Sequence, residues 1–290
     1  MNWFRLARIA LLPTIAWDFT VGILLATGSL ANWPWLAFVA VALIYHGSMI
    51  LNDVADLKID IAAQRKRPLV RKEISQRVAL FVGLFMYCLA AGICYLYFKE
   101  IFDLSLYLIA TVLVYNFSPS ALRKHIGPAL LATARAFSLM FGAAALLGPA
   151  QALNDIAYTN IMCYALYFLF LSRMAQHEED GIAGMRGFSF VGMACLAPFL
   201  LLAADSYSPV LVVCLLGFAA FAGRHAWACR GQYWSQEIVQ AQTRSSLCLA
   251  PVVLGLCLLS SEQTDNQWLA LVSIGVVVLT TTLAKSFTIE

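Results

Sequence analysis

The sequence predicts an all-α fold, a polytopic bundle of nine to ten transmembrane helices. Of the 290 residues, 61% are apolar and 12% are charged, whereas about 25% of residues are charged in a typical soluble domain. The mean hydropathy is +0.78. So little charge cannot cover a globule in water, which excludes a soluble enzyme, a disordered chain and a nucleic-acid-binding module. The apolar runs are continuous rather than alternating, which favours helices over a β-barrel.

Ten apolar runs follow one another along the chain. Each is a candidate span, because about 20 predominantly apolar residues cross a bilayer. The runs cover residues 9–29, 33–51, 78–98, 104–117, 127–147, 158–171, 188–204, 209–222, 239–260 and 268–284. The fourth and sixth runs are short, which leaves the number of spans at nine or ten. Nothing between the runs has the composition of a linker, so we expect one domain over residues 1–290.

The basic residues predict the orientation of the chain. With the N-terminus in the cytosol, every one of the 19 basic residues except Lys99 falls on the cytosolic side or within a span. This distribution follows the positive-inside rule. The outer turns carry acidic residues, among them Glu100, Asp103 and Asp155. We therefore expect an integral protein of a bacterial inner (cytoplasmic) membrane, with its N-terminus and active-site loops in the cytosol.

An acidic cluster lies at the inner end of the second run. Asp53, Asp56 and Asp60 follow Asn52, and on a continuous helix they would share one face. Carboxylates stacked in this way repel one another unless a cation lies among them. Magnesium binds one or two carboxylates and leaves other positions to substrate phosphates. The cluster indicates a Mg²⁺ site, and a solvated acidic helix end is the alternative.

A basic segment follows this cluster. It contains Arg65, Lys66, Arg67, Arg71 and Lys72. Arginine pairs with phosphate oxygens through two parallel hydrogen bonds, so the segment favours a diphosphate ligand beside the metal. A role in membrane topology alone is the alternative.

At these residues the chain resembles the UbiA superfamily of membrane prenyltransferases, with an EboC-like branch as the nearest fit. The first family signature, NDxxDxxxD, matches in full over residues 52–60, and an Arg-Pro-Leu element follows at residues 67–69. The sequence YNFSPSALRK at residues 115–124 is similar to the family's YSxxLKR element. The resemblance implies a helix bundle around a central cavity that opens near the cytosolic side.

The second family motif, DxxxD, is altered in this chain. Gln176 replaces its earlier aspartate, whereas Asp180 matches the later one. Glutamine offers a carbonyl oxygen but no charge, and Glu178 or Glu179 could compensate. The second magnesium site, and with it the type of reaction, stays open.

The resemblance implies an enzyme that uses Mg²⁺ to transfer an isoprenyl group from a prenyl diphosphate to a small-molecule or lipid acceptor within the membrane. The allylic diphosphate would ionise, with the leaving group stabilised electrostatically. The expected partners are the prenyl diphosphate, the acceptor and membrane lipid, and no nucleic acid. A terpene cyclase of the UbiA type, which needs no acceptor, and a non-catalytic isoprenoid-lipid carrier are the alternatives.

The residues expected at the site fall into three groups. The metal ligands are Asp53, Asp56, Asp60, Glu179 and Asp180, the catalytic residues are Asp53, Asp56, Arg67, Arg123 and Lys124, and the substrate-binding residues are Asn52, Arg8, Tyr115, Arg135 and Gln176. Arg135 lies inside the fifth run, where a charged group is costly. We expect it to reach the diphosphate side of the cavity, and an ion pair with Asp18 is the alternative.

Overall fold

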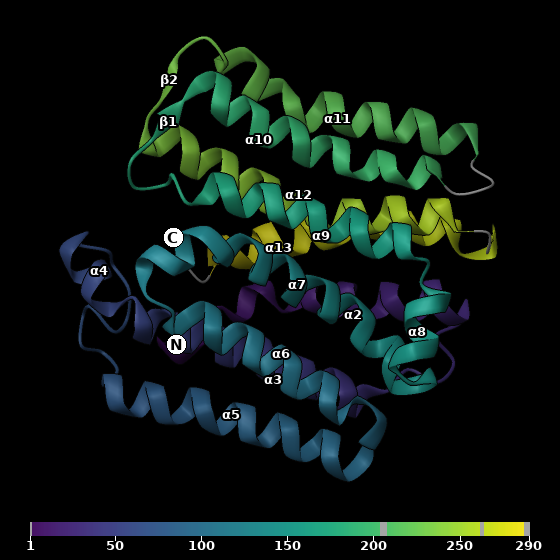
Figure 1. The fold of residues 1–290 in the computed structure, drawn as a ribbon, viewed down its shortest axis with the longest axis horizontal. Coiled ribbons are helices and arrows are strands. Elements are labelled where there is room, and N and C mark those ends of the chain that lie inside the picture. Colours follow the sequence, from purple (N-terminus) through teal and green to yellow (C-terminus); the bar gives the residue numbers. More distant parts are fainter. Residues whose placement is uncertain (1, 204–207, 262–263, 287–290) are drawn as a thin grey trace.

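The computed structural model describes residues 2–203, 208–261 and 264–286. The chain forms a bundle whose long helices run along the longest axis of the molecule (Figure 1). In the described ranges, nine helices are long and apolar enough to cross a membrane, and a tenth span is a pair of helices with a 90° bend between them. The predicted all-α bundle of nine to ten spans is confirmed.

The first half of the chain forms seven α-helices and two 3-10 helices. They are α1 (Asn2–Leu6), η1 (Ile9–Leu11), α2 (Leu12–Thr27), α3 (Trp35–Ala55), α4 (Leu57–Ala62), α5 (Gln76–Tyr97), η2 (Lys99–Ile101), α6 (Phe102–Phe117) and α7 (Ser120–Leu147).

In the described residues, the second half adds six α-helices, two 3-10 helices and a short two-stranded antiparallel sheet. They are α8 (Pro149–Asp155), α9 (Tyr158–Ala175), β1 (Ile182–Ala183), α10 (Gly184–Leu196), η3 (Ala197–Ala203), α11 (Pro209–Cys229), β2 (Tyr233–Trp234), α12 (Gln236–Ser260), η4 (Thr264–Leu271) and α13 (Val272–Ser286). The predicted seventh run ends at Ala204, which lies outside the described residues.

The sixth predicted run, residues 158–171, lies within α9, and the break in the chain comes just before it. Helices α8 and α9 meet at 90°, and Ala157 at the break has a φ of 58°, a left-handed conformation that non-glycine residues seldom adopt. The break explains why this run is short: only α9 follows the direction of the neighbouring helices (Figure 1).

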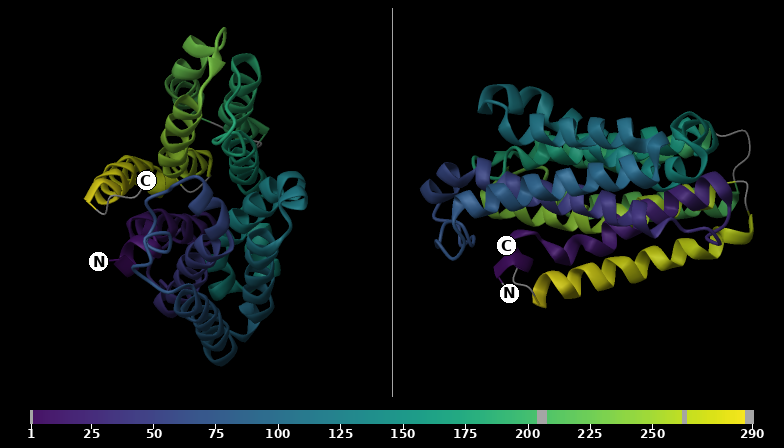
Figure 2. Two further views of the ribbon diagram at one scale, coloured as in Figure 1. Left: turned by 90° about the vertical axis from the view of Figure 1, so that its left-hand side faces the viewer. Right: turned by 90° about the horizontal axis from the view of Figure 1, so that it is seen from below.

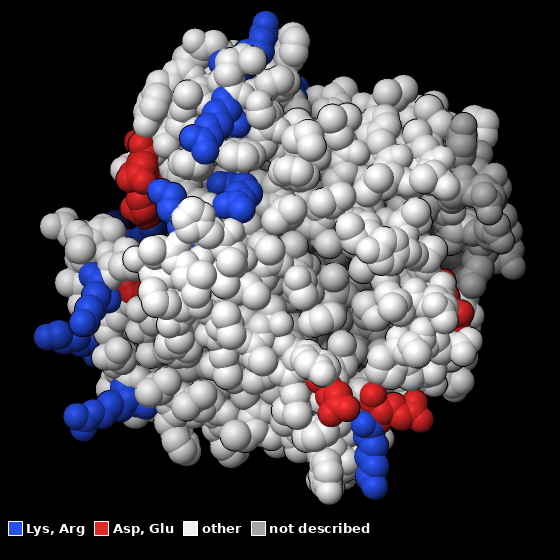
Figure 3. Space-filling view, viewed as in Figure 1, with Lys and Arg blue, Asp and Glu red and all other residues white. Residues whose placement is uncertain are grey.

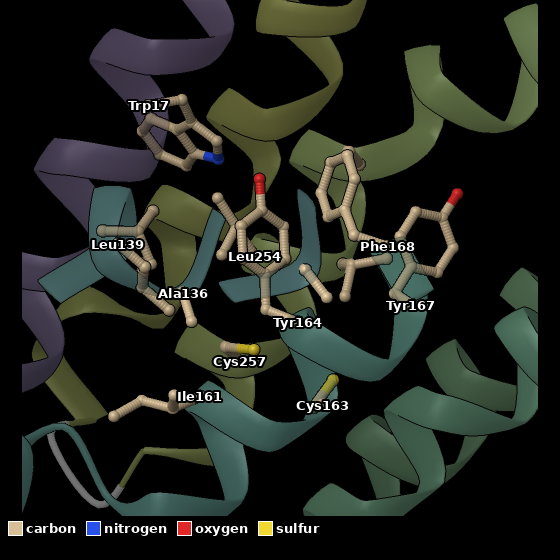
Figure 4. Close-up of a cluster of buried hydrophobic side chains, with 14 of the residues drawn as sticks. Trp17, Ala136, Leu139, Ile161, Cys163, Tyr164, Tyr167, Phe168, Leu254 and Cys257 are labelled. Carbon is tan, nitrogen blue, oxygen red and sulfur yellow. The ribbon is translucent and has the colours of Figure 1, made fainter. Parts of the chain in front are cut away.

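Helices α2 and α7 approach each other closely at two glycines. A Cβ atom on Gly22 would lie 1.7 Å from the backbone oxygen of Leu139, and one on Gly142 would lie 2.8 Å from the backbone oxygen of Phe19. Small residues allow membrane helices to pack at such short range. Side chains from α2, α7, α9 and α12 meet beside this contact in a buried cluster that includes Leu139 and Tyr164 (Figure 4).

The two ends of the bundle carry different charges. On the face in Figure 3, lysine and arginine gather mainly at the end where α4 and the two-stranded sheet lie, with acidic side chains beside them, and a second group of acidic side chains lies near the lower part of the opposite end. Both chain ends that Figure 2 marks lie near α4 rather than α8. This basic end, called the α4 end below, also holds both acidic motifs.

Candidate functional site

Two adjoining cavities open at the α4 end of the bundle. A polar cavity of about 300 Å³ has six basic side chains in its wall, Arg5, Arg8, Arg65, Lys66, Arg67 and Arg244. A mainly apolar cavity of about 360 Å³ extends between α2, α3, α6, α7, α9 and α12. Four residues line both, Arg8, Glu178, Thr243 and Leu247. The two cavities therefore lie next to each other, with the polar one at the basic end and the apolar one within the bundle.

Asp53 and Asp60 gather around a single arginine beside the polar cavity. The Nη1 atom of Arg67 lies 3.0 Å from Oδ1 of Asp53 and 2.7 Å from Oδ2 of Asp60. Both aspartates are almost fully buried, at 3% and 1% exposure. Because one nitrogen contacts both carboxylates, the two acidic groups lie close together with a positive charge between them.

Asp56 has different partners from its two neighbours. The long helix α3 ends at Ala55 and α4 begins at Leu57, so Asp56 stands at the junction. Its Oδ1 atom is 2.7 Å from Nη1 of Arg123 on α7, and its Oδ2 atom accepts a hydrogen bond from Asn52 at 3.3 Å. The amide of Asn52 also contacts Oδ1 of Asn116 at 3.4 Å. These contacts connect the first motif to the start of α7 and to the wall of the apolar cavity.

Burial acts on the charge of Asp60. Desolvation raises the pKa of its carboxyl above the usual range, and the guanidinium groups of Arg67 and Arg65 act in the opposite direction. Its Oδ1 atom is buried without a hydrogen bond in the described structure, although Nη1 of Arg65 lies 3.3 Å away. A buried carboxylate oxygen of this kind can still accept a hydrogen bond or bind a cation.

The first motif fits a divalent cation, although the cation ligands are not fully gathered. No group of three His, Cys, Asp or Glu residues in the described ranges is close enough to hold a metal ion. Asp53 and Asp60, however, already share one positive group, and Mg²⁺ in proteins needs only one or two carboxylates beside substrate phosphates. The carboxylate pair around Arg67 therefore suits Mg²⁺ once a diphosphate supplies further oxygens.

The second motif turns most of its polar side chains away from the cavities. Glu179 is exposed and pairs with Arg65, and Asp180 is exposed. The side-chain amide of Gln176 donates to the backbone oxygen of Lys124 at 2.9 Å. Neither Gln176 nor the two acids line the cavities. The structure thus links Glu179 to Asp60 only through Arg65, and it gathers no group of three acids in the described ranges that could hold a metal ion.

Glu178 is the acid of this segment that faces inward. It lines both cavities and is near Arg8, Arg65 and Arg244. Burial raises the pKa of Glu178 above the usual range, while a hydrogen bond with Thr243 and the arginines act against that rise. From the sequence alone, Glu178 is only one of two possible substitutes for the missing aspartate, since nothing local to the motif distinguishes it from Glu179.

The orientation of this segment comes from α12 and strand β2. Gln240 donates to the backbone oxygen of Glu178 at 3.4 Å, Gln236 donates to that of Glu179, and Tyr233 donates to that of Asp180 at 2.6 Å. Three successive carbonyls are therefore held by residues more than 50 positions away in the chain.

Arg8 joins the two cavities from the N-terminal side. It has a left-handed backbone, with φ 52° and ψ 47°, between α1 and η1, and strain of this kind persists where the surroundings enforce it. Its Nη2 atom lies 3.1 Å from Oδ1 of Asp53. The conformation lets a residue next to a membrane span place its guanidinium against the acidic pair.

The remaining expected residues lie at different depths. Tyr115 lines the apolar cavity, and the guanidinium carbon of Arg123 is 6.0 Å from its ring centre. Lys124 is exposed outside both cavities. Arg135 lines the apolar cavity but forms an ion pair with Asp18 at 2.7 Å. Arg135 therefore makes the ion pair that was the alternative to a diphosphate contact, and this pair lies deep in the bundle.

A family model of the UbiA prenyltransferase family matches residues 12–247. The chain belongs to this family. The match covers every residue of both motifs and of the basic segment, and it extends beyond the first six runs on which the resemblance rested. None of the curated proteins compared with the chain is a significant match.

Solved structures with similar folds come from the same group of proteins. One, from a study of digeranylgeranylglyceryl phosphate synthase in membranes, is 15% identical with a TM-score of 0.58, and the match covers 90% of this chain and 97% of that one. Two structures of a UbiA homolog from Archaeoglobus fulgidus are each 14% identical. The structure bound to DMAPP and Mg²⁺ has a TM-score of 0.49, and the match covers 90% of this chain and 99% of that one. The structure bound to GPP and Mg²⁺ has a TM-score of 0.47, and the match covers 99% of this chain and 98% of that one. At these identities the likeness concerns the fold.

Membership of the family supports a prenyltransferase-type enzyme that uses a prenyl diphosphate. Together with nine apolar helices in the described ranges, it supports an integral membrane protein.

Proposed function

We propose that this protein transfers an isoprenyl group from a prenyl diphosphate to an acceptor inside the membrane, with Mg²⁺ as cofactor. The observation that carries the proposal is the pair of adjoining cavities, one polar with six basic side chains and one apolar within the bundle. A prenyl diphosphate has the same two parts, an anionic head and an apolar tail. The head fits the polar cavity, and the tail fits the apolar one.

Asp53 and Asp60 would hold Mg²⁺ from one side of the polar cavity, with Glu178 on the other side. When bound, the ion neutralises charge on the diphosphate oxygens. Arg67, which lies between Asp53 and Asp60 in this structure, would turn to the diphosphate when the cation takes its place. Arg67 would thus pair with the two aspartates when no substrate is bound and with the diphosphate when it is.

The basic residues then act on the leaving group. Arg8, Arg65 and Arg67 would donate hydrogen bonds to the diphosphate and stabilise the negative charge that grows as the allylic C–O bond breaks. The electron pair of that bond leaves with the diphosphate. The apolar wall excludes water, so the allylic cation forms its new bond with an electron pair of the acceptor, whose proton leaves.

We also propose that the α4 end faces the cytosol of a bacterial inner membrane. The support is the distribution of charge, since every lysine and arginine except Lys99 lies on that side or within a span. This orientation gives a soluble diphosphate direct access to the polar cavity.

The test uses purified protein in detergent with Mg²⁺ and a panel of geranyl, farnesyl and geranylgeranyl diphosphates. Pyrophosphate release is measured first without an acceptor and then with a lipid extract, and products are identified by mass spectrometry. Prenylated lipid and acceptor-dependent release would support transfer. A hydrocarbon or terpene alcohol formed without an acceptor would contradict transfer and indicate a terpene cyclase. Binding of the prenyl diphosphate without its consumption would contradict transfer and indicate a non-catalytic carrier.

A further inference from the structure

A charged pair lies deep in the bundle, at the wall of the apolar cavity. Arg135 is 15 residues beyond the start of α7, which is about 22 Å along a helix with a rise of 1.5 Å per residue. Its partner Asp18 is on α2 and is 1% exposed. The close contact of α2 with α7 at Gly22 and Gly142 brings the two together. Ionisable groups at such depth are costly, and they commonly mark binding sites.

Both carboxylate oxygens of Asp18 already have a partner inside the bundle. One of its oxygens is 2.7 Å from Nη1 of Arg135, and the other accepts a hydrogen bond from the Tyr164 hydroxyl at 2.6 Å. The acid does not line the cavity. It neutralises the arginine from behind, among the buried side chains around Tyr164 (Figure 4).

Arg135 faces the cavity instead. It lines the wall, and its side chain is 15% exposed. Its guanidinium carbon lies 4.6 Å from the ring centre of Phe168 and 5.3 Å from that of Tyr45, which also line the cavity. In the described structure the side chain makes one hydrogen bond, and none of its nitrogens is buried without a partner. Since a guanidinium has five N–H donors, the remaining donors are open to the cavity.

The charge of the pair selects the kind of ligand. Arg135 and Asp18 together are neutral, so a neutral oxygen acceptor completes the hydrogen bonds without adding charge. A carboxylate would instead bring an uncompensated negative charge into the interior of the bundle, where an unpaired charge is strongly unfavourable. The diphosphate has its own basic cavity at the α4 end.

We propose that Arg135, neutralised by Asp18, binds the hydroxyl or carbonyl oxygen of a neutral, largely apolar second ligand. If the proposed function holds, this ligand is the acceptor of the isoprenyl group; the binding itself does not depend on that reaction. The rings of Tyr45 and Phe168 flank the guanidinium and hold it in place, and the hydroxyl of Ser138 adds a polar group to the same wall.

The test measures equilibrium binding to the purified full-length protein in detergent, without Mg²⁺ or prenyl diphosphate. The probes are 1-naphthol, 1-naphthoate and naphthalene, which share one ring system and differ in the polar group. We expect 1-naphthol to bind about tenfold more tightly than naphthalene, the gain of one hydrogen bond to a charged donor, and 1-naphthoate to bind more weakly than 1-naphthol. Equal binding of naphthol and naphthalene, or tighter binding of naphthoate, would overturn the proposal.

The matched variant carries Asp18→Asn and Arg135→Met together. It removes both charges and therefore leaves no unpaired buried charge, and the asparagine still accepts from Tyr164. We expect it to bind naphthalene as the wild type does and to lose the preference for 1-naphthol. Arg224→Met is the control, because Arg224 also packs over an aromatic ring, at 4.0 Å from that of Phe221, but lies outside both cavities.

Two further variants keep the result interpretable. Arg135→Lys retains the charge but not the planar donors, so it tests the site even if the double variant does not fold; an unreduced preference for 1-naphthol in it would count against the guanidinium. Asp53→Asn should lose prenyl diphosphate turnover while retaining the naphthol preference. Failure of the proposed reaction and failure of this binding site are thus distinguishable.

Discussion

The two acidic segments at the α4 end place their side chains in different ways. In the first, Asp53 and Asp60 are buried and share Arg67, and Asp56 pairs with Arg123. In the second, Glu178 alone of the three consecutive acids lines the cavities. The orientation of the backbone, more than the number of acids in a segment, therefore decides which carboxylates reach the cavities.

Replacing the two buried aspartates should have the largest effect. In Asp53→Asn and in Asp60→Asn we expect Mg²⁺-dependent pyrophosphate release from geranyl diphosphate to fall by about 100-fold or more, as for the loss of a principal electrostatic group. Asp103→Asn is the matched control, because Asp103 is an exposed acid at the start of α6. Wild-type rates in both aspartate variants would refute the role of the pair.

In the second segment, neighbouring glutamates should behave differently. Glu178→Gln removes the carboxylate that faces the cavities, and we expect roughly a tenfold loss of kcat/KM, which corresponds to about 1.4 kcal/mol. Glu179→Gln removes an exposed ion pair with Arg65, which is worth about 1 kcal/mol or less, and we expect a change within about twofold. Steady-state kinetics at varied Mg²⁺ would measure both. A larger effect at Glu179 would reverse our assignment.

Restoring the aspartate of the family motif should not restore a metal ligand. In Gln176→Asp, the carboxylate would face the backbone oxygen of Lys124 in place of an amide donor. The lost hydrogen bond and the repulsion should cost about 1–3 kcal/mol, so we expect a lower Tm and unchanged affinity for Mg²⁺. A clear gain in Mg²⁺ affinity would show that this position reaches the cation.

A small effect is also expected at Lys124, near the start of α7. Lys124→Gln should alter kcat/KM by less than about threefold, since changes to exposed residues are usually small. Arg123→Gln should have a greater effect because it leaves Asp56 without its ion pair. Comparison of the two variants in one assay gives the measurement, and equal losses would mean that Lys124 acts on the substrate after all.

The sequence was sufficient for the spans and for the position of the first motif, because both depend on neighbouring residues. A hydropathy run is a local property, and the spacing of Asp53 to Asp60 lies within two helical turns. Their burial around Arg67 could not be predicted, since it depends on how the segment after α4 folds back.

The orientation of the second motif was out of reach for a similar reason. Glu178 faces inward because Gln240, Gln236 and Tyr233 hold the backbone from a distant part of the chain. Likewise, the pairing of Arg135 with Asp18 depends on the packing of α2 against α7. The roles of Asp53, Asp56, Asp60, Glu179 and Asp180 as metal ligands stay predictions.

The most direct test of the proposed site is calorimetric binding of inorganic pyrophosphate, which carries the head group without the tail. Wild-type protein should bind it at least about tenfold more tightly with Mg²⁺ than with a chelator, an effect of about 1.4 kcal/mol. This gain should vanish in the variant with both Asp53→Asn and Asp60→Asn. Binding that is indifferent to Mg²⁺, or a gain that survives in that variant, would contradict a cation held by these two acids.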